Sequence, residues 1–113
     1  MFIKKFIIPL HKRKTMDSNV INKIVGYLKT QPVLKAWIFG SYSRGEERDD
    51  SDVDIMVRFL PSANVSLMKH AAMIVDLQDL IRRRVDLVTD RGIMDFAIPS
   101  VEHDKILIYE RER

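Results

Sequence analysis

The sequence predicts an α/β domain, in the broader sense α+β, in which a small mixed sheet has helices packed against it. Three observations lead to this class. Helical and strand-like apolar patterns follow one another in the order helix, strand, strand, helix, strand, helix, short strand. The chain has 113 residues, which suits one core. Its hydrophobic share of 46% and charged share of 31% are typical of globular proteins.

Residues 1–15 read as a basic leader, separate from the single domain expected over residues 16–113. Residues 1–14 hold five basic residues and no acid, whereas the rest of the chain holds fourteen basic and sixteen acidic residues. The net charge of +3 therefore comes from the leader, and we expect no direct nucleic-acid binding by the domain. Three interpretations of the leader stay open: an extra strand or docking arm, a disordered tail, or sequence upstream of a start at Met16.

The composition also excludes several kinds of chemistry. The chain has no cysteine, so it has no disulfide framework, thiolate metal site or cysteine nucleophile. No apolar run approaches the roughly 20 residues of a membrane span. We therefore expect a cytoplasmic protein with no membrane partner.

The first regular elements are a helix over about residues 18–30 and a strand over residues 33–39. Asp17 or Ser18 can cap the helix, and Pro32 ends it. Its apolar residues recur at helical spacing and form one stripe: Val20, Ile21, Ile24, Val25 and Leu28.

The next strand, over residues 52–59, separates acidic from apolar side chains. Asp52 and Asp54 are two residues apart, so both carboxylates lie on one face of the strand. Val53 and Ile55 then lie on the other face, toward a core. Two neighbouring carboxylates repel each other unless a cation lies between them, and Mg²⁺ prefers carboxylate oxygens supplemented by substrate phosphates.

The turn before this strand has the residues of a phosphate site. Gly40 allows an unusual backbone angle, and Ser41 offers a hydroxyl and a backbone N–H. Arg44 lies close enough to neutralise further phosphate charge, and Ser43 is a weaker candidate. A phosphate site followed by two carboxylates indicates a nucleotidyl or phosphoryl transferase.

A second long helix and a third strand complete the predicted site. The helix begins near Asn64 or Ser66 and runs to about Ile81. Its expected buried face consists of Leu67, Ala71, Ile74, Val75 and Ile81, with Met68 and Ala72 beside them. The strand over residues 85–89 places Asp86 opposite to its apolar neighbours, so all three acids meet if this strand pairs with residues 52–59. Short helical pieces over residues 90–104 and a strand over residues 106–109 follow.

Three ordered segments now support a family resemblance. Gly40-Ser41, Arg44-Gly45-Glu46 and Ser51-Asp52-Val53-Asp54 resemble the signature of the DNA polymerase beta-like nucleotidyltransferase superfamily. The short chain narrows the resemblance to the minimal nucleotidyltransferase group, over roughly residues 18–110. The segment Arg84-Val85-Asp86-Leu87-Val88-Thr89 resembles the strand that carries the family's third acid, with Asp86 in its place.

The resemblance implies a fold, a reaction and a partner. Asp52, Asp54 and Asp86 would be catalytic and hold two Mg²⁺ ions, and the nucleotide would be bound by Gly40, Ser41, Ser43 and Arg44. Members of the group are commonly antitoxins whose toxin is a helical HEPN-domain ribonuclease. The chain would transfer AMP from ATP to a tyrosine hydroxyl of that toxin, neutralise it and form a hetero-oligomer with it.

Two alternatives remain open at this point. A small-molecule nucleotidyltransferase working as an oligomer would be active without a partner protein. An antitoxin that acts by binding alone would form a tight complex that does not depend on Asp52 and Asp54. A chain of this length leaves no space for an acceptor-binding domain, which favours a partner that brings its own surface.

Overall fold

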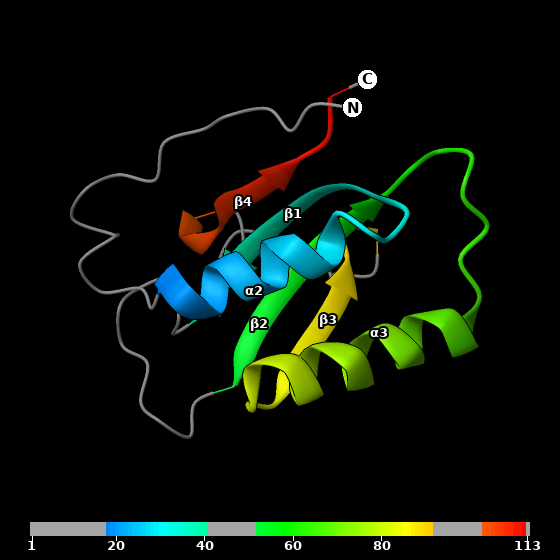
Figure 1. Ribbon diagram of the computed structural model, residues 1–113. Helices are drawn as coiled ribbons and strands as arrows, with labels where there is room; N and C mark the ends of the chain where they lie inside the picture. Colours follow the sequence, from blue (N-terminus) through cyan, green and yellow to red (C-terminus); the bar gives the residue numbers. More distant parts are fainter. Residues whose placement is uncertain (1–17, 41–51, 92–102, 113) are drawn as a thin grey trace.

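The computed structural model describes residues 18–40, 52–91 and 103–112, which form one four-stranded sheet and two helices (Figure 1). The bounds are Ser18–Leu28 for α2, Val33–Phe39 for β1, Val53–Phe59 for β2, Leu67–Ile81 for α3, Val85–Thr89 for β3 and Ile106–Glu110 for β4. Each agrees with an expected element to within a few residues at either end. Both helices lie on the same face of the sheet (Figure 1). The predicted mixed sheet with helices packed against it is confirmed.

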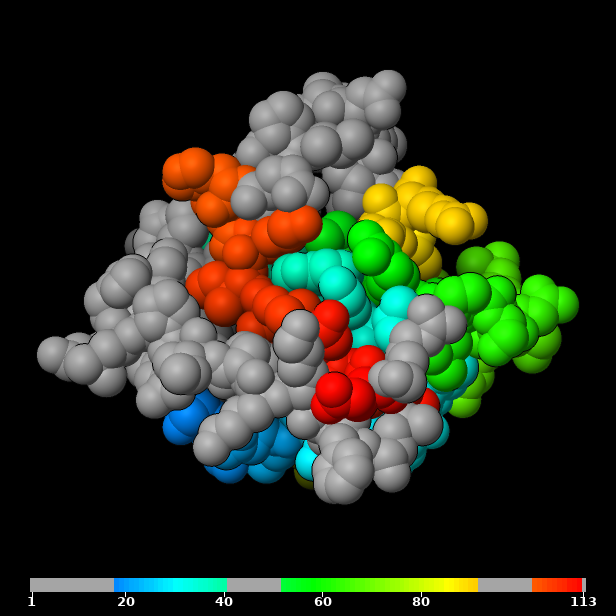
Figure 2. All heavy atoms as spheres, turned by 90° about the horizontal axis from the view of Figure 1, so that it is seen from above, coloured from blue at the N-terminus to red at the C-terminus, as the bar shows by residue number. Residues whose placement is uncertain are grey.

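The order of the strands is β3-β2-β1-β4, with β2 and β1 in the centre. β1 pairs antiparallel with β2 and with β4, whereas β2 pairs parallel with β3. A parallel pair needs a crossover, which α3 supplies between β2 and β3. Figure 2 shows β4, coloured orange to red, at the surface beside β1.

The main core lies between the sheet and the two helices. The buried side chains of α2 are the predicted ones, Val20, Ile21, Ile24 and Leu28. They pack with the apolar residues of the strands and with three residues of α3, namely Met73, Leu77 and Ile81. In β2 the core residues are Val53, Ile55 and Val57, as the alternation predicted.

The other face of the sheet, called the distal face below, carries a smaller apolar cluster. Trp37 and Met56 are buried there. Three partly buried residues pack against them, namely Phe39, Val88 and Leu107. Since Asp54 and Asp86 alternate with core residues on their strands, they share this face.

The predicted buried face of α3 was right for Ile81, which is buried, and for Ile74, which packs against the core, and wrong for its other residues. Leu67 and Met68 are each 84% exposed and Val75 is 54% exposed, while Ala71 and Ala72 are also exposed. The buried residues of α3 are Met73, Leu77 and Ile81, and the polar residues His70 and Gln78 are half-buried beside them. His70 Nε2 lies 2.7 Å from the carbonyl oxygen of Leu87, and the Gln78 side chain accepts a hydrogen bond of 3.1 Å from the N–H of Val85.

These two polar contacts explain why α3 turns this face inward. β3 is at the edge of the sheet, where half of its backbone groups have no neighbouring strand. His70 and Gln78 satisfy two of those groups, so burying them costs little and completes the edge. The helix itself begins at the predicted cap, because the Ser66 side chain accepts a hydrogen bond from the N–H of Lys69.

The end of the described chain is tied to the end of α2. The Arg111 guanidinium donates hydrogen bonds to the carbonyl oxygens of Lys29 and Gln31, at 3.0 Å and 2.8 Å. It also donates one to the Tyr109 hydroxyl at 2.9 Å. These contacts join β4 to the turn between α2 and β1.

Some expectations fall outside the described residues. They concern the leader 1–15, the polar segment 41–51 and most of the short helical pieces expected over residues 90–104. Within the described part of the chain, no helix is long and apolar enough to cross a membrane.

Candidate active site

The candidate site lies at one end of the sheet, where three neighbouring strands meet. β1 ends beside Gly40, β2 begins after Asp52, and β3 carries Asp86 as its second residue. The register places Asp54 opposite Phe39 on one side and opposite Asp86 on the other. The sheet therefore brings together four of the predicted site residues: Gly40, Asp52, Asp54 and Asp86.

The two paired acids are held close together by the backbone. Neighbouring strands are about 4.8 Å apart, and Asp54 and Asp86 are register partners on the same face. Asp54 is half-buried, whereas Asp52 and Asp86 are exposed. Two carboxylates in this arrangement repel each other, which costs stability in the absence of a cation.

Gly40 is required by the way Asp54 packs. Its φ angle is +74°, in the left-handed region that disfavours other residues. A Cβ atom at this position would lie 2.2 Å from Oδ2 of Asp54. The Asp54 carboxylate is therefore seated directly against the backbone of the turn, in a space that only glycine leaves.

The carboxylates suit a hard divalent cation by their chemistry. The three acids offer only oxygen donors, which is the set that Mg²⁺ prefers. Among residues 18–40, 52–91 and 103–112, which include all three acids, no three or more His, Asp or Glu side chains form a group that could hold a metal ion. The metal site therefore stays a prediction, and the predicted phosphate residues Ser41, Ser43 and Arg44 lie outside the described residues.

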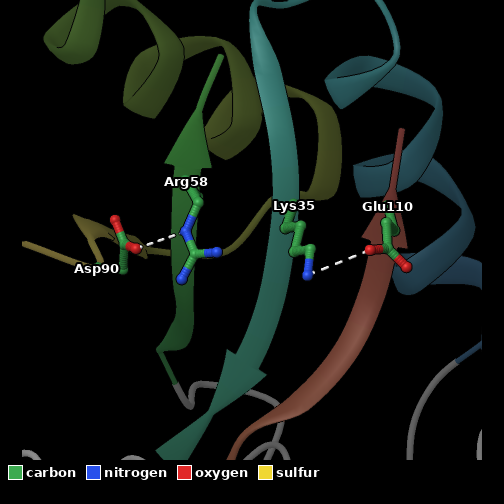
Figure 3. Close-up of polar contacts among 4 residues, drawn as sticks. All are labelled: Lys35, Arg58, Asp90 and Glu110. Atoms are coloured by element: carbon green, nitrogen blue, oxygen red, sulfur yellow. Dashed lines mark hydrogen bonds and ion pairs between the residues drawn. The ribbon is translucent and has the colours of Figure 1, made fainter. Parts of the chain in front are cut away.

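Farther along the distal face, charged residues pair with one another. Figure 3 shows Arg58 of β2 pointing toward Asp90 and Lys35 of β1 pointing toward Glu110 of β4. The Arg58 Nε–Asp90 Oδ2 distance is 2.7 Å and the Lys35 Nζ–Glu110 Oε2 distance is 3.2 Å. Arg58 and Lys105 also lie over the Trp37 ring, at 5.5 Å and 5.0 Å from its centroid.

This charged layer was not predicted from the sequence, although one signal was available. Lys35 and Arg58 each stand two residues from an apolar residue of the distal face, as strand alternation requires. Trp37 is only 8% exposed beneath its two cations. Its ring is therefore part of the smaller cluster and is not free to stack on a base.

One surface pocket of about 480 Å³ lies at the opposite end of β2 and β3 from the acids. Its lining residues are Arg58, Phe59, Leu60, Pro61, Ala63, Thr89, Asp90 and Arg91. None of the predicted site residues lines it. Two of its three charged lining residues, Arg58 and Asp90, form an ion pair with each other, and the third is Arg91.

A glycine turn followed by an acid-bearing strand, with a third acid on the parallel neighbour, is the arrangement expected of a nucleotidyltransferase. Residues 22–113 match the family described as polymerase beta, nucleotidyltransferase. The chain therefore belongs to this family, and it is a nucleotidyltransferase.

Known relatives refine this class. The chain is 49% identical over 78 residues to the protein adenylyltransferase MntA of Thermococcus cleftensis, an alignment that covers 67% of this chain and 75% of that protein. It resembles a crystal structure of a toxin–antitoxin complex with AMP-PNP, with a TM-score of 0.69, 23% identity, and coverage of 81% and 74%. It also resembles a complex of the tri-AMPylated HEPN toxin of Shewanella oneidensis with an MNT antitoxin, with a TM-score of 0.66, 21% identity, and coverage of 85% and 74%. At these identities the two structures show the shared fold.

Proposed function

We propose that this protein is an antitoxin that transfers AMP from ATP to a tyrosine hydroxyl of a partner HEPN toxin and thereby neutralises it. One observation carries the proposal: Asp54 is seated against Gly40 and stands in register with Asp86. The assignment to protein adenylyl transfer is supported by the relative at 49% identity, which bears that activity in its name. The partner class is supported by solved complexes of the same fold.

In the proposed reaction, different residues of the site bind the phosphates, hold the metal ions and accept the proton. Gly40 and Ser41 would bind the β- and γ-phosphates of ATP through backbone N–H groups, with Ser43 and Arg44 adding a hydroxyl and a positive charge. Asp52, Asp54 and Asp86 would hold two Mg²⁺ ions, which neutralise the triphosphate and acidify the acceptor hydroxyl when bound. Asp86 would take the hydroxyl proton.

The bonds that change follow from these roles. The acceptor oxygen forms a bond to the α-phosphorus of ATP. The bond from that phosphorus to the bridging oxygen of the β-phosphate breaks, and pyrophosphate leaves. The acceptor gains one AMP unit through a phosphodiester bond.

The test is a transfer assay with the purified partner. The protein, ATP, Mg²⁺ and the product of the adjacent gene, expected to be the HEPN toxin, would be incubated together, and the intact mass of both proteins would be measured. We expect the toxin to gain whole AMP units with the wild type and none with the double variant Asp52→Ala/Asp54→Ala.

The other outcomes separate the alternatives. A tight complex with both wild type and double variant, but no mass gain on the toxin, would indicate neutralisation by binding alone. Consumption of ATP without the toxin, with AMP found on an added small molecule, would indicate a small-molecule transferase. Either result would overturn the proposal.

A further inference from the structure

The order of the strands separates the side of the site where ATP would bind from the side where the acceptor hydroxyl would approach. β2 lies between β1 and β3, so Gly40 at the end of β1 and Asp86 on β3 are on opposite sides of Asp54. If the triphosphate is bound beside Gly40, as the proposed function requires, the acceptor approaches over β3. The residues of β3 near Asp86 are therefore those that an acceptor would meet.

Arg84 directly precedes β3 and is the basic residue nearest to Asp86 in the sequence, and hydrogen bonds hold the backbone at Arg84 and at Val85. The N–H of Val53 donates a hydrogen bond of 2.9 Å to the carbonyl oxygen of Arg84. The following N–H, that of Val85, donates to the Gln78 side chain at 3.1 Å. One hydrogen bond therefore holds the backbone of Arg84 to β2, and another holds the backbone of Val85 to α3.

The register places Arg84 beside the acids. Val53 and Val85 are partners and both are buried in the main core. Asp52 and Arg84 directly precede these two partners, outside the strands, and the hydrogen bond from the Val53 N–H to the Arg84 carbonyl oxygen holds Arg84 beside the start of β2. By alternation Arg84 shares the distal face with Asp86, two residues and about 7 Å farther along.

The guanidinium of Arg84 is available for a ligand. Arg84 is exposed, and no ion pair formed within the described segments includes it, although Asp52 and Asp86 are close by. A guanidinium presents a planar fork of N–H donors that matches a phosphate group in two-point contact. Arg84 lies next to the acids of the candidate site without forming an ion pair with them, so it could bind an anionic group of the incoming acceptor.

The acceptor of the first AMP transfer and the acceptor of a later transfer differ in charge. A tyrosine hydroxyl, the first acceptor, has no negatively charged group that would lie beside β3. An acceptor that already carries AMP presents a ribose hydroxyl for the next transfer and a phosphodiester on the same nucleotide.

We propose that Arg84 is a positioning residue that binds the phosphodiester of an acceptor already carrying AMP and so favours the second and later transfers. The inference rests on the proposed function and deepens it. In each later step the ribose oxygen forms a bond to the α-phosphorus of a new ATP, and pyrophosphate leaves. The hydroxyl proton passes to Asp86, and Arg84 neither gains nor loses a proton.

The test compares the first and second transfers in one time course. Intact mass would follow unmodified, mono-AMP and di-AMP toxin with the wild type, Arg84→Gln and Arg84→Lys. The matched control is Arg91→Gln, which removes an exposed positive charge beyond the other end of β3. A phosphodiesterase digest would show whether the AMP units are joined to one another.

We expect Arg84→Gln to keep the rate of the first transfer within about twofold and to lower that of the second by about tenfold or more, because the variant loses a charge-assisted hydrogen bond to the phosphodiester. Arg84→Lys should restore part of the second rate, and Arg91→Gln should match the wild type. If Arg84→Gln were poorly folded, both transfers would slow together and its unfolding midpoint would fall. The rates of the first and second transfers would then be compared between the wild type and Arg84→Lys.

Three results would overturn the inference while leaving the proposed function intact. They are equal effects of Arg84→Gln on both transfers, no effect on either, and AMP units placed singly on separate hydroxyls. A wild type that transfers no AMP at all would instead contradict the proposed function, and the inference with it.

Discussion

At the scale of single residues, Gly40 is constrained twice. Its positive φ angle disfavours any side chain, and the Asp54 carboxylate occupies the space where a Cβ would be. The residue thus links the shape of the turn to the position of an acid. The two constraints make Gly40 a sensitive position of the site, although it carries no reacting group.

Gly40→Ala should lower both stability and transfer. The left-handed backbone costs a non-glycine residue about 1 to 2 kcal/mol, and the contact with Asp54 adds to this cost. The control is Gly26→Ala in α2, where an added Cβ meets nothing within 4 Å. That change should stabilise the protein by about 1 kcal/mol, because alanine is the better helix former.

Urea unfolding and the rate of AMP transfer would be measured for both glycine variants. A Gly40→Ala protein with wild-type stability and activity would show that Asp54 moves freely away from the turn. The structure would then be wrong about how this acid is held.

At the scale of elements, the positions of the strands could be predicted from the sequence, whereas the side of α3 that is buried could not. The segments 33–39, 52–59 and 85–89 are dense in branched and aromatic residues, so their positions could be predicted. In the last two, acids alternate with apolar residues, so their facing could be predicted as well. α3 has apolar residues on both sides, so periodicity alone did not decide which side is buried. The deciding factor is the edge of β3, whose backbone groups bind His70 and Gln78, and a single sequence does not show which strand is at an edge.

The contact between the helices gives a prediction about pH. The Tyr27 hydroxyl of α2 donates a hydrogen bond of 2.7 Å to Asp76 of α3. Burial, followed by this hydrogen bond and the negative charge of Asp76, raises the pKa of Tyr27 above its ordinary value of 10.0. The folded protein therefore keeps the phenol proton at a pH where the unfolded chain loses it.

The free energy of unfolding of the wild type should accordingly be unaffected by this group below about pH 10 and should fall as the pH rises above that value. Tyr27→Phe removes the ionisable group, and Asp76→Asn removes the charge that opposes ionisation. Urea unfolding at pH 8 and near pH 11 would be compared for the three proteins. Equal losses of stability in wild type and Tyr27→Phe would contradict the assignment.

At the scale of the whole molecule, the site depends on the parallel pairing of β2 and β3. Asp52 and Asp54 were identified from their spacing on one strand, with Gly40 just before them. Asp86 belongs to a later strand and joins them only because α3 carries the chain across so that Asp86 and Asp54 become partners. The sequence alone did not show that β2 and β3 pair, because the residues around Asp86 would also fit an ordinary edge strand.

The most direct measurement of the central claim is therefore the initial rate of AMP transfer to the HEPN toxin by Asp86→Asn at saturating ATP and Mg²⁺. Asp79→Asn, which changes an exposed acid on α3, is the matched control. We predict a loss of about 100-fold or more for Asp86→Asn, in the range expected for removal of a general base. Its unfolding midpoint should be no lower than that of the wild type, because repulsion from Asp54 is relieved, and Asp79→Asn should transfer within about twofold of the wild-type rate. An Asp86→Asn protein that transfers AMP at the wild-type rate would contradict the claim that the acids of β2 and β3 form one active site.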